Sequence, residues 1–335
     1  MAKLKVGVIG ARSIGAKHGG EPQSPNIGYY HAGNIQKSNL GEVVAISRTY
    51  KEGALRTAKI FNSAFNAECK GYDDPIKMLD HKKLDLVYIC TPPEYHLQLV
   101  EEALARGIHV VCEKPLAYPD LSKKDEILKH AESLVNLAGK EGLYFFVVKQ
   151  YATLLGDINS ILKTENGKQE IKNVSMFIES KGDKKRGDII ADLYPHSIIK
   201  HLVKRNGAMT NPTVVMDNDF AILTFEYGDC ECEIMLSQSS PTEKRDLPHI
   251  KVNDFKFELH REETEEYNLS LRYKTNVNGQ KKEVSVLVGD PLRNLDEMML
   301  RHISSSKKRK SIVSAKHGLR DLEDMFTLVE ATKIN

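Results

Sequence analysis

The first half of the sequence alternates short apolar runs with longer amphipathic stretches, and this alternation limits the fold more than any other feature. The runs are rich in β-branched residues, whereas apolar residues in the intervening stretches recur with helical spacing. Strand–helix–strand repeats of this kind build a parallel sheet with helices on both faces. The predicted strands are Leu4–Ile9, Val43–Ser47, Leu84–Cys90, Ile108–Cys112 and Leu143–Val148.

One of these repeats is especially clear. Pro93 stands at a helix start, and Leu97, Val100 and Leu104 share one helical face before a glycine ends the helix. We therefore predict a βαβ crossover here and a doubly wound α/β domain over residues 1–149.

After about residue 150 the pattern becomes that of an α+β domain. Beyond a first helical stretch, strand-like runs follow one another, and two tight-turn dipeptides separate neighbouring runs, which is typical of antiparallel strands. Residues 150–335 are thus predicted to contain a large open, mainly antiparallel sheet, and the final helix is a candidate to pack back on the first domain. The predicted segments are the helix Leu154–Leu162, the strands Val174–Glu179 and Phe220–Tyr227, the turns Gly228-Asp229 and Asn278-Gly279, and the closing helices Leu292–Ile303 and Leu319–Ala331.

Size and charge favour a two-domain protein with a small-molecule partner. The 335 residues exceed what one hydrophobic core usually serves. A net charge of +2 gives too weak a field to favour nucleic acid or a membrane as partner. No apolar run approaches the ~18 residues of a membrane span, so we expect a cytoplasmic location. Five scattered cysteines form no disulfide framework, and Cys230 and Cys232 lack a second pair with zinc spacing, so no metal site is predicted.

The end of the first predicted strand carries an imperfect dinucleotide-binding fingerprint. In G-x-G-x-x-G the glycines let backbone N–H groups approach a pyrophosphate at a helix N-terminus. Gly10 and Gly15 supply the first and third glycines, but Arg12 stands at the second position.

A second copy of the pattern, at Gly28, competes for the helix start. Gly28 lies 20 residues before Arg48, which is the spacing expected of the residue that meets the adenosine ribose. We therefore predict that Arg12–Asn26 is an enlarged loop inserted within the fingerprint. The alternative is a surface loop beside a site that binds no nucleotide.

The residues at the end of the second predicted strand bear on the choice of cofactor. Ser47 and Arg48 stand where an NAD enzyme would carry an acid for the ribose hydroxyls. A guanidinium with a flanking hydroxyl suits a 2′-phosphate, which favours NADP over NAD. The alternative is an arginine that only solvates the strand end.

Two further segments follow strand ends, where ligands of open parallel sheets bind. Thr91, Pro92 and His96 follow one strand, and Glu113-Lys114-Pro115 follows the next. A lysine at such a position would be partly desolvated, which lowers its pKa or makes it a strong donor to a substrate oxygen. A lysine that snorkels to the surface is the alternative.

The second domain offers an acid/base pair. Asp192 and His196 are four residues apart, and on a helix they would share a face, where the carboxylate could orient the imidazole. Alternatively, Asp192 caps a helix.

Taken together, these segments resemble the glucose-fructose oxidoreductase, inositol dehydrogenase and MocA (Gfo/Idh/MocA) family, over nearly the whole chain. Ser47-Arg48 also looks like the variant found in its NADP-using members. The matching motifs are T-P-x-x-x-H at Thr91–His96, A-L-x-x-G-x-H-V at Ala103–Val110, E-K-P at Glu113–Pro115 and D-x-x-x-H at Asp192–His196.

The resemblance implies an NAD(P)-dependent oxidoreductase acting on a secondary alcohol or ketone of a sugar, sugar derivative or polyol. Lys114 would bond the reacting oxygen and position the nicotinamide, while His196 with Asp192 exchanges the proton. The open sheet would form a homodimer or homotetramer interface. A non-catalytic nicotinamide-binding regulator is the alternative function. The cofactor, NADP or possibly NAD, would be bound by Gly10, Arg12, Gly28, Ser47, Arg48, Thr91, Pro92, His96 and Glu113.

The chain departs from the family pattern in its second domain. Tyr194 stands where the family often has glycine, and Ile199 replaces an aspartate that helps to hold sugar hydroxyls. We expect a less polyhydroxylated substrate or a different grip on it, for which Lys149 is a candidate.

Overall fold

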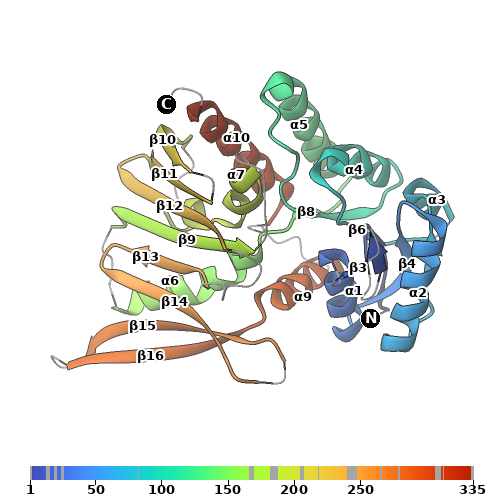
Figure 1. Ribbon diagram of the computed structural model, residues 1–335, viewed down its shortest axis with the longest axis horizontal. Helices are drawn as coiled ribbons and strands as arrows, with labels where there is room; N and C mark the ends of the chain where they lie inside the picture. Colours follow the sequence, from blue (N-terminus) through green and yellow to red (C-terminus); the bar gives the residue numbers. More distant parts are fainter. Residues whose placement is uncertain are drawn as a thin grey trace. The chain divides into compact units, whose positions relative to one another are not determined.

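The chain forms two compact units (Figure 1). The first comprises Met1–Tyr118, Asp125–Val148 and Leu295–Leu319, and the second comprises Pro119–Lys124, Lys149–Asn294 and Arg320–Asn335. The sequence predicts one division between residues 149 and 150, whereas each compact unit is made of three segments of the chain. The computed structural model describes all residues except 1, 13–15, 19–20, 24–25, 82, 166–169, 182–187, 204–206, 218, 240–246, 265, 278–279, 306–310, 312 and 333–335.

The first unit is built on a parallel six-stranded sheet with the order β5-β4-β1-β6-β7-β8. The chain runs outward from β1 through β4 to β5 and returns to β6 on the other side of β1. The carboxyl ends of β1 and β6 therefore border the topological switch point, where open α/β sheets bind ligands. The strands are β1 (Leu4–Ile9), β4 (Gly41–Ser47), β5 (Lys70–Tyr72), β6 (Leu86–Ile89), β7 (His109–Cys112) and β8 (Phe145–Val147).

Helices cover both faces of this sheet. A Cβ at Gly41 would meet Ile35 of α1, together with Val6 of β1, whereas a Cβ at Gly7 would meet Met78 of α3. Val6 and Gly7 are consecutive in β1, so their side chains point to opposite faces. The helices of this unit include α1 (Ile27–Lys37), α2 (Lys51–Phe65), α3 (Pro75–His81), α4 (His96–Leu104), most of α5 (Lys124–Lys140) and most of α9 (Pro291–Ser304).

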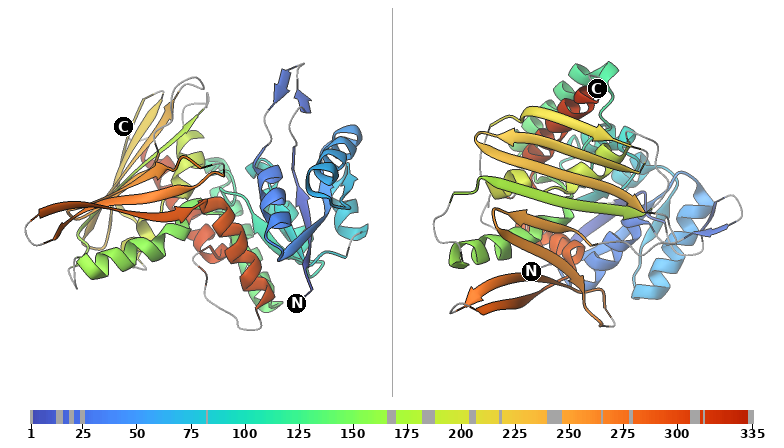
Figure 2. Two further views of the ribbon diagram at one scale, coloured as in Figure 1. Left: turned by 90° about the horizontal axis from the view of Figure 1, so that it is seen from below. Right: turned by 60° about the vertical axis from the view of Figure 1, so that its left-hand side comes forward.

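A short hairpin separates β1 from α1. Its strands are β2 (Ala16–His18) and β3 (Glu21–Gln23), and it extends away from the end of β1 (Figure 2). Helix α1 begins at Ile27, so the second copy of the glycine pattern opens the helix, as its spacing to Arg48 predicts. Gly15, in the competing copy, lies outside the described residues.

The segment 295–319 belongs to the first unit because it covers the outer edge of β8. The N–H of Val147 donates to the carbonyl of Val313 at 2.8 Å, and Phe146 forms an antiparallel bridge with Ser314. Helix α10 (Ala315–Ala331) starts here, and only its residues 315–319 belong to this unit. The packing of the final helix on the first domain stays a prediction.

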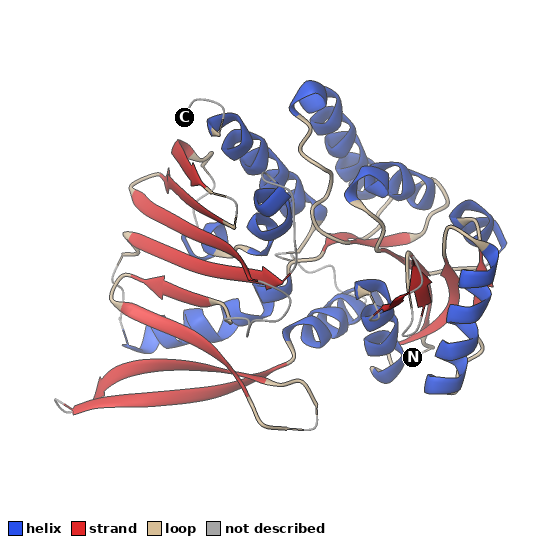
Figure 3. Cartoon of the chain, in the orientation of Figure 1, coloured by secondary structure: helices blue, strands red, loops and turns tan. Residues whose placement is uncertain are grey.

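The second unit contains an eight-stranded sheet, coloured red at the left of Figure 3. Its order is β10-β11-β12-β9-β13-β14-β15-β16, and every pairing is antiparallel except that of β12 with β9. The predicted turn at Gly228-Asp229 joins β11 to β12, whereas Asn278-Gly279 lies outside the described residues. The strands are β9 (Asn173–Lys181), β10 (Thr210–Met216), β11 (Phe220–Tyr227), β12 (Cys230–Ser239), β13 (His249–Val252), β14 (Phe255–Arg261), β15 (Leu269–Val277) and β16 (Gln280–Gly289).

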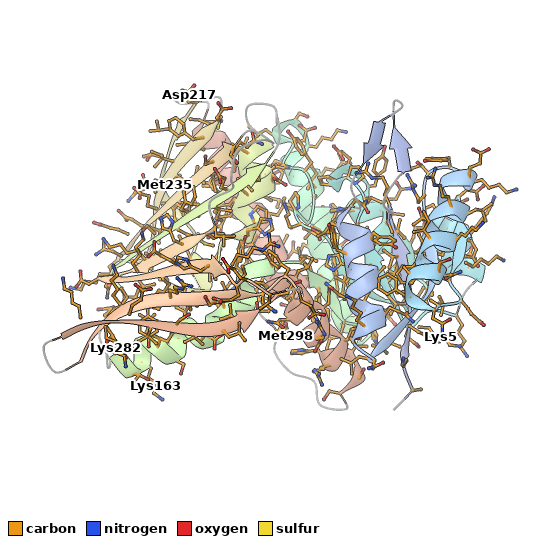
Figure 4. The ribbon with its side chains drawn as sticks, turned by 60° about the horizontal axis from the view of Figure 1, so that its bottom comes forward. Lys5, Lys163, Asp217, Met235, Lys282 and Met298 are labelled. Carbon is orange, nitrogen blue, oxygen red and sulfur yellow. The ribbon has the colours of Figure 1, made fainter. Side chains whose placement is uncertain are left out.

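One face of this sheet forms the core of the second unit. In β12, Cys230, Cys232, Ile234 and Leu236 are buried, whereas Met235 is 36% exposed and lies on the other face (Figure 4). The core face packs against α6 (Leu155–Glu165), α7 (Asp188–Leu193), α8 (Ile199–Val203) and residues 320–331 of α10. None of the described helices is both long and apolar enough to cross a membrane.

Candidate active site

Two glycines allow β1, β6 and α1 to approach one another closely. Gly10 follows β1 with φ of +89°, and a Cβ there would lie 2.5 Å from the carbonyl oxygen of Cys90. Gly28 is in the first turn of α1, and its Cβ would lie 3.0 Å from the Cβ of Cys90 and 3.1 Å from the Cα of Ala11. These are the places of the first and last glycines of a dinucleotide fingerprint.

Asn26 closes the base of the inserted loop. Its Nδ2 donates to the carbonyl of Gly10 at 2.5 Å, and its Oδ1 accepts the backbone N–H of Arg12 at 2.6 Å. The backbone N–H of Asn26 also donates to the carbonyl of Arg12 at 3.0 Å, and its Oδ1 caps α1 through the N–H of Tyr29. The sequence analysis missed this role, although an asparagine immediately before a helix is a strong N-cap signal.

The end of β4 presents Ser47 and Arg48. Ser47 is 1% exposed, its carbonyl accepts the N–H of Gly10 at 2.9 Å, and its Oγ has no hydrogen-bond partner among the described residues. The Arg48 guanidinium lies 4.9 Å from the Tyr50 ring centroid, and its Nη1 donates to Oγ1 of Thr57 at 3.3 Å. These contacts hold the guanidinium at the strand end.

The segment after β6 is joined to the segment after β7 by His96. The two ring nitrogens lie 2.8 Å from the carbonyl oxygens of Pro115 and Thr91. Burial lowers the pKa of His96, so its neutral ring donates to one carbonyl at a time. This ring is fully buried, so His96 joins the two segments through these carbonyls, and its role in cofactor binding stays a prediction. Pro92 is exposed, and Oγ1 of Thr91 has no hydrogen-bond partner among the residues described.

Lys114 follows β7 and is half-buried, with a cis peptide bond to Pro115. The neighbouring Glu113 is 6% exposed, and both of its carboxylate oxygens have protein partners. Oε1 lies 2.9 Å from Nε2 of His31, and Oε2 accepts the backbone N–H of Lys114 at 3.0 Å. The Glu113 side chain therefore supports Lys114, and the role of Glu113 in cofactor binding stays a prediction.

His31 joins Glu113 to a second carboxylate. Its Nδ1 lies 2.7 Å from Oδ1 of Asp296, whose Oδ2 accepts from Nδ2 of Asn34 at 2.9 Å. Burial opposes a charge on the ring, but Asp296 and Glu113 outweigh it and raise the pKa of His31 to about 10. The imidazolium in turn lowers the pKa of Glu113 despite the burial of that carboxyl group. We call Glu113, His31 and Asp296 the His31 cluster.

In the second unit, Asp192 and His196 do not lie on one α-helix. Helix α7 ends at Leu193, and a 3₁₀ turn with Pro195 carries the chain to His196. The condition under which the pair would share a helical face is therefore not met, because proline lacks the N–H that would continue α7. Both side chains are partly exposed, and the His196 ring lies 5.7 Å from the Tyr151 ring.

Lys149 and Lys200 hold the segment that carries His196. The Lys149 ammonium donates to the Ser197 carbonyl at 2.7 Å and pairs with Asp321 at 2.8 Å. Lys149 is 3% exposed, so it is not available to replace the aspartate missing at Ile199.

On the same segment, Lys200 pairs with Asp324 at 2.8 Å, and Asp324 also accepts from the hydroxyls of Tyr194 and Tyr227 at 3.1 and 2.7 Å. Burial and the charge of Asp324 raise the pKa values of both tyrosines, and burial raises that of Asp321. The Lys149/Lys200 cluster comprises Lys149, Lys200, Asp321, Asp324, Tyr194 and Tyr227.

The first-unit residues fit a dinucleotide. Gly10 and Gly28 form a cradle that a Cβ would fill, and at the same edge of the sheet the buried hydroxyls of Ser47 and Thr91 have no hydrogen-bond partner within the described part of the chain. No group of three or more His, Cys, Asp and Glu side chains among the described residues is placed to hold a metal ion.

Comparison with known proteins agrees with this geometry. Residues 4–147 match the model of the GFO/IDH/MocA oxidoreductase family, described as having an NAD-binding Rossmann fold. The Rossmann domain belongs to this family. This Gfo/Idh/MocA domain contains Gly10, Lys114 and the His31 cluster except for Asp296.

Three similar proteins illustrate the relationship. Inositol 2-dehydrogenase 4 of Saccharopolyspora erythraea is 32% identical over 119 residues, which is 35% of this chain and 30% of that protein. A 3-ketoreductase of Actinomadura kijaniata, solved with TDP-benzene and NADP, superposes with a TM-score of 0.71 at 16% identity, and the match covers 99% of this chain and 98% of that chain. An Agrobacterium radiobacter oxidoreductase solved with NAD+ has a TM-score of 0.72 at 15% identity, and the match covers 99% of this chain and 97% of that chain.

The sequence match and the structural matches cover different parts of the proteins. The sequence match spans under a third of the inositol dehydrogenase. The structural matches cover both units and confirm the predicted fold class, a Rossmann sheet with a second, mainly antiparallel domain.

Proposed function

We propose that this protein is an NADP-dependent oxidoreductase that acts on a secondary alcohol or ketone of a sugar, sugar derivative or polyol. The observation that carries the proposal is the position of Lys114, at the end of β7 beside the dinucleotide cradle of the same unit. Bound nicotinamide supplies the hydride chemistry. The protein has to hold the substrate oxygen and move one proton.

Lys114 and His196 are assigned to that oxygen. The Lys114 ammonium donates to the reacting oxygen, and His196, assisted by Asp192, accepts its proton in oxidation and returns it in reduction. A positioned acid/base contributes typically ~10²–10⁴-fold to such a step. The carbohydrate class of substrate is supported by the names of the inositol dehydrogenase and the 3-ketoreductase.

A screen of sugars, sugar acids, inositols and nucleotide sugars with both cofactors tests this proposal. We expect turnover with at least one compound and its loss in Lys114→Met and His196→Ala, with NADPH binding retained. If both variants turn over substrate like the parent protein, the catalytic assignment is wrong.

The preference for NADP is proposed from Arg48. Its guanidinium is fixed by Tyr50 and Thr57 at the end of β4, and no acidic side chain stands there for the ribose hydroxyls. We expect NADPH to bind more tightly than NADH in titrations that follow nicotinamide fluorescence. Arg48→Ala should remove most of this preference by losing a charge-assisted contact, whereas Arg56→Ala, an exposed arginine of α2, should not. Tighter binding of NADH by the parent protein would overturn the assignment.

We also propose that the protein is a homodimer or homotetramer that associates through the open face of the eight-stranded sheet. Met235 is paired with Ile222 and Phe177 on neighbouring strands, so an apolar row crosses that face. Apolar rows on exposed sheets are usually buried against a partner. Light scattering should give a multiple of 37.7 kDa that Met235→Glu reduces; a monomeric parent protein would refute this.

A regulator that binds nicotinamide without turnover is the second candidate. The observation that favours it is the altered fingerprint, in which Asn26 occupies the backbone N–H of Arg12. A parent protein that binds NADPH but turns over none of the screened compounds would support this alternative.

A further inference from the structure

We propose that His31 is a positioning residue, which holds the Glu113 carboxylate so that Glu113 fixes the backbone of Lys114 at the end of β7. The inference rests on the proposed function only in giving Lys114 a catalytic task. The placement of Lys114 by His31 can be tested without turnover.

A continuous series of hydrogen bonds connects α9 to Lys114. Asp296 holds Nδ1 of His31, Nε2 of His31 holds one oxygen of Glu113, and the other oxygen of Glu113 accepts the Lys114 N–H. His31 and Asp296 are both 0% exposed, so water cannot replace either partner without rearrangement.

A charged ring is needed between these two carboxylates. A buried carboxylate without a partner is strongly disfavoured, and without His31 two carboxylates would share one buried space without the cation that lies between them, although Asn34 and the Lys114 N–H would still donate to them. Glu113 would then take up a proton or turn toward water. Either change weakens its bond to the Lys114 N–H.

The E-K-P tripeptide is thus held by two buried histidines in different charge states. The protonated His31 acts on Glu113, and the neutral His96 acts on the carbonyl of Pro115. Lys114 lies between these two fixed points, and its side chain is the half-buried member of the three.

The test is amide hydrogen exchange in the full-length protein without cofactor, resolved at single residues. The N–H groups of Val110 and Glu113 are the internal references, because they donate to the carbonyls of Tyr144 and Ile89 within the sheet. In His31→Gln we expect the Lys114 amide to exchange at least about tenfold faster, relative to both references. The matched control His130→Gln, on an exposed histidine that contacts Glu101, should change none of these rates.

Two further variants keep the proposal falsifiable if His31→Gln folds poorly. Asp296→Asn retains the side-chain volume and should accelerate Lys114 exchange less than His31→Gln does. His31→Gln combined with Glu113→Gln removes the charge of Glu113, and an amide oxygen can still accept the Lys114 N–H, so this variant should recover part of the lost protection.

If the Lys114 amide exchanges at the same rate in His31→Gln and in the parent protein, the proposal is overturned. The proposal is also overturned if the exchange rates of Val110, Glu113 and Lys114 all increase by the same factor, because that result marks general destabilisation. Faster exchange at Lys114 alone, together with normal turnover by Lys114→Met, would leave the positioning intact and refute the proposed catalytic role.

Discussion

The two units each bury a group of charges beside a segment of the proposed active site, but they balance those charges differently. In the His31 cluster, two carboxylates share one imidazolium. In the Lys149/Lys200 cluster, each aspartate has its own ammonium, and Asp324 has two tyrosine hydroxyls in addition. The first cluster therefore depends on an imidazolium whose stabilising charge is lost as the pH rises toward 10, whereas the second depends on ammonium groups.

The two clusters are alike in that each contacts the backbone at or next to a residue proposed to be catalytic. Glu113 directly precedes Lys114. In the second unit, Tyr194 precedes His196 by two residues and Ser197 directly follows it. In both cases a buried neighbour fixes the backbone, and the side chain proposed to be catalytic is partly exposed. The difference in charge balance leads to three separable predictions.

The largest effect on stability is expected at Asp324. Asp324→Ala would leave the Lys200 ammonium and one of the two tyrosine hydroxyls without an acceptor, because Tyr194 and Tyr227 can still bond to each other. The expected cost is about 3–5 kcal/mol in the free energy of unfolding. Urea denaturation measures this loss. Glu330→Ala, which breaks the exposed pair with Lys124, is the control and should cost under about 1 kcal/mol. Equal losses would mean that the second cluster contributes no more than a surface pair.

The next effect is a dependence of stability on pH that comes from His31. Its pKa of about 10 in the folded protein exceeds the unfolded value of 6.5, so the stabilisation is complete below pH 6.5 and is lost as the pH rises toward 10. The free energy of unfolding of the parent protein should therefore fall relative to that of His31→Gln by about 1.4 kcal/mol per pH unit between pH 7 and 9. Parallel curves for the two proteins would show that the ring is not charged.

The smallest expected loss of unfolding free energy is that of Asp321→Asn. Asp321→Asn leaves Lys149 its bond to the Ser197 carbonyl and offers it an amide oxygen, so we expect a loss of only about 1–2 kcal/mol. No ring titrates in this cluster, so the loss should be constant between pH 7 and 9. A slope as steep as that of His31→Gln would remove the distinction between the two clusters.

The sequence predicted features that depend on local pattern. The strand Leu4–Ile9 was predicted with its observed bounds, and the start of α1 followed from the distance between Gly28 and Arg48. Strand β5 was missed, because three residues that include a glycine give no periodic signal. The continuous helix considered for Asp192 and His196 failed at Pro195, where the chain changes to a 3₁₀ turn.

The supporting contacts could not be predicted, because they join residues far apart in the chain. His31 and Asp296 are separated by 265 positions, and Tyr194 and Asp324 by 130. A single buried histidine inside an amphipathic helix looks like any core position. The partners of Lys149 are equally distant, because neither Asp321 nor the Ser197 carbonyl is near it in sequence.

The most direct test of the account is the turnover of Lys114→Met with the compound that gives the highest rate in the screen. We predict a fall of about 10³-fold or more in kcat, as for loss of a positioned proton-handling group, with the Kd for NADPH within about threefold of the parent value. The control is Lys123→Met, at an exposed lysine that follows Lys114 in the sequence, and it should retain the parent rate. Parent-like turnover by Lys114→Met would contradict the central claim that this lysine acts on the reacting oxygen.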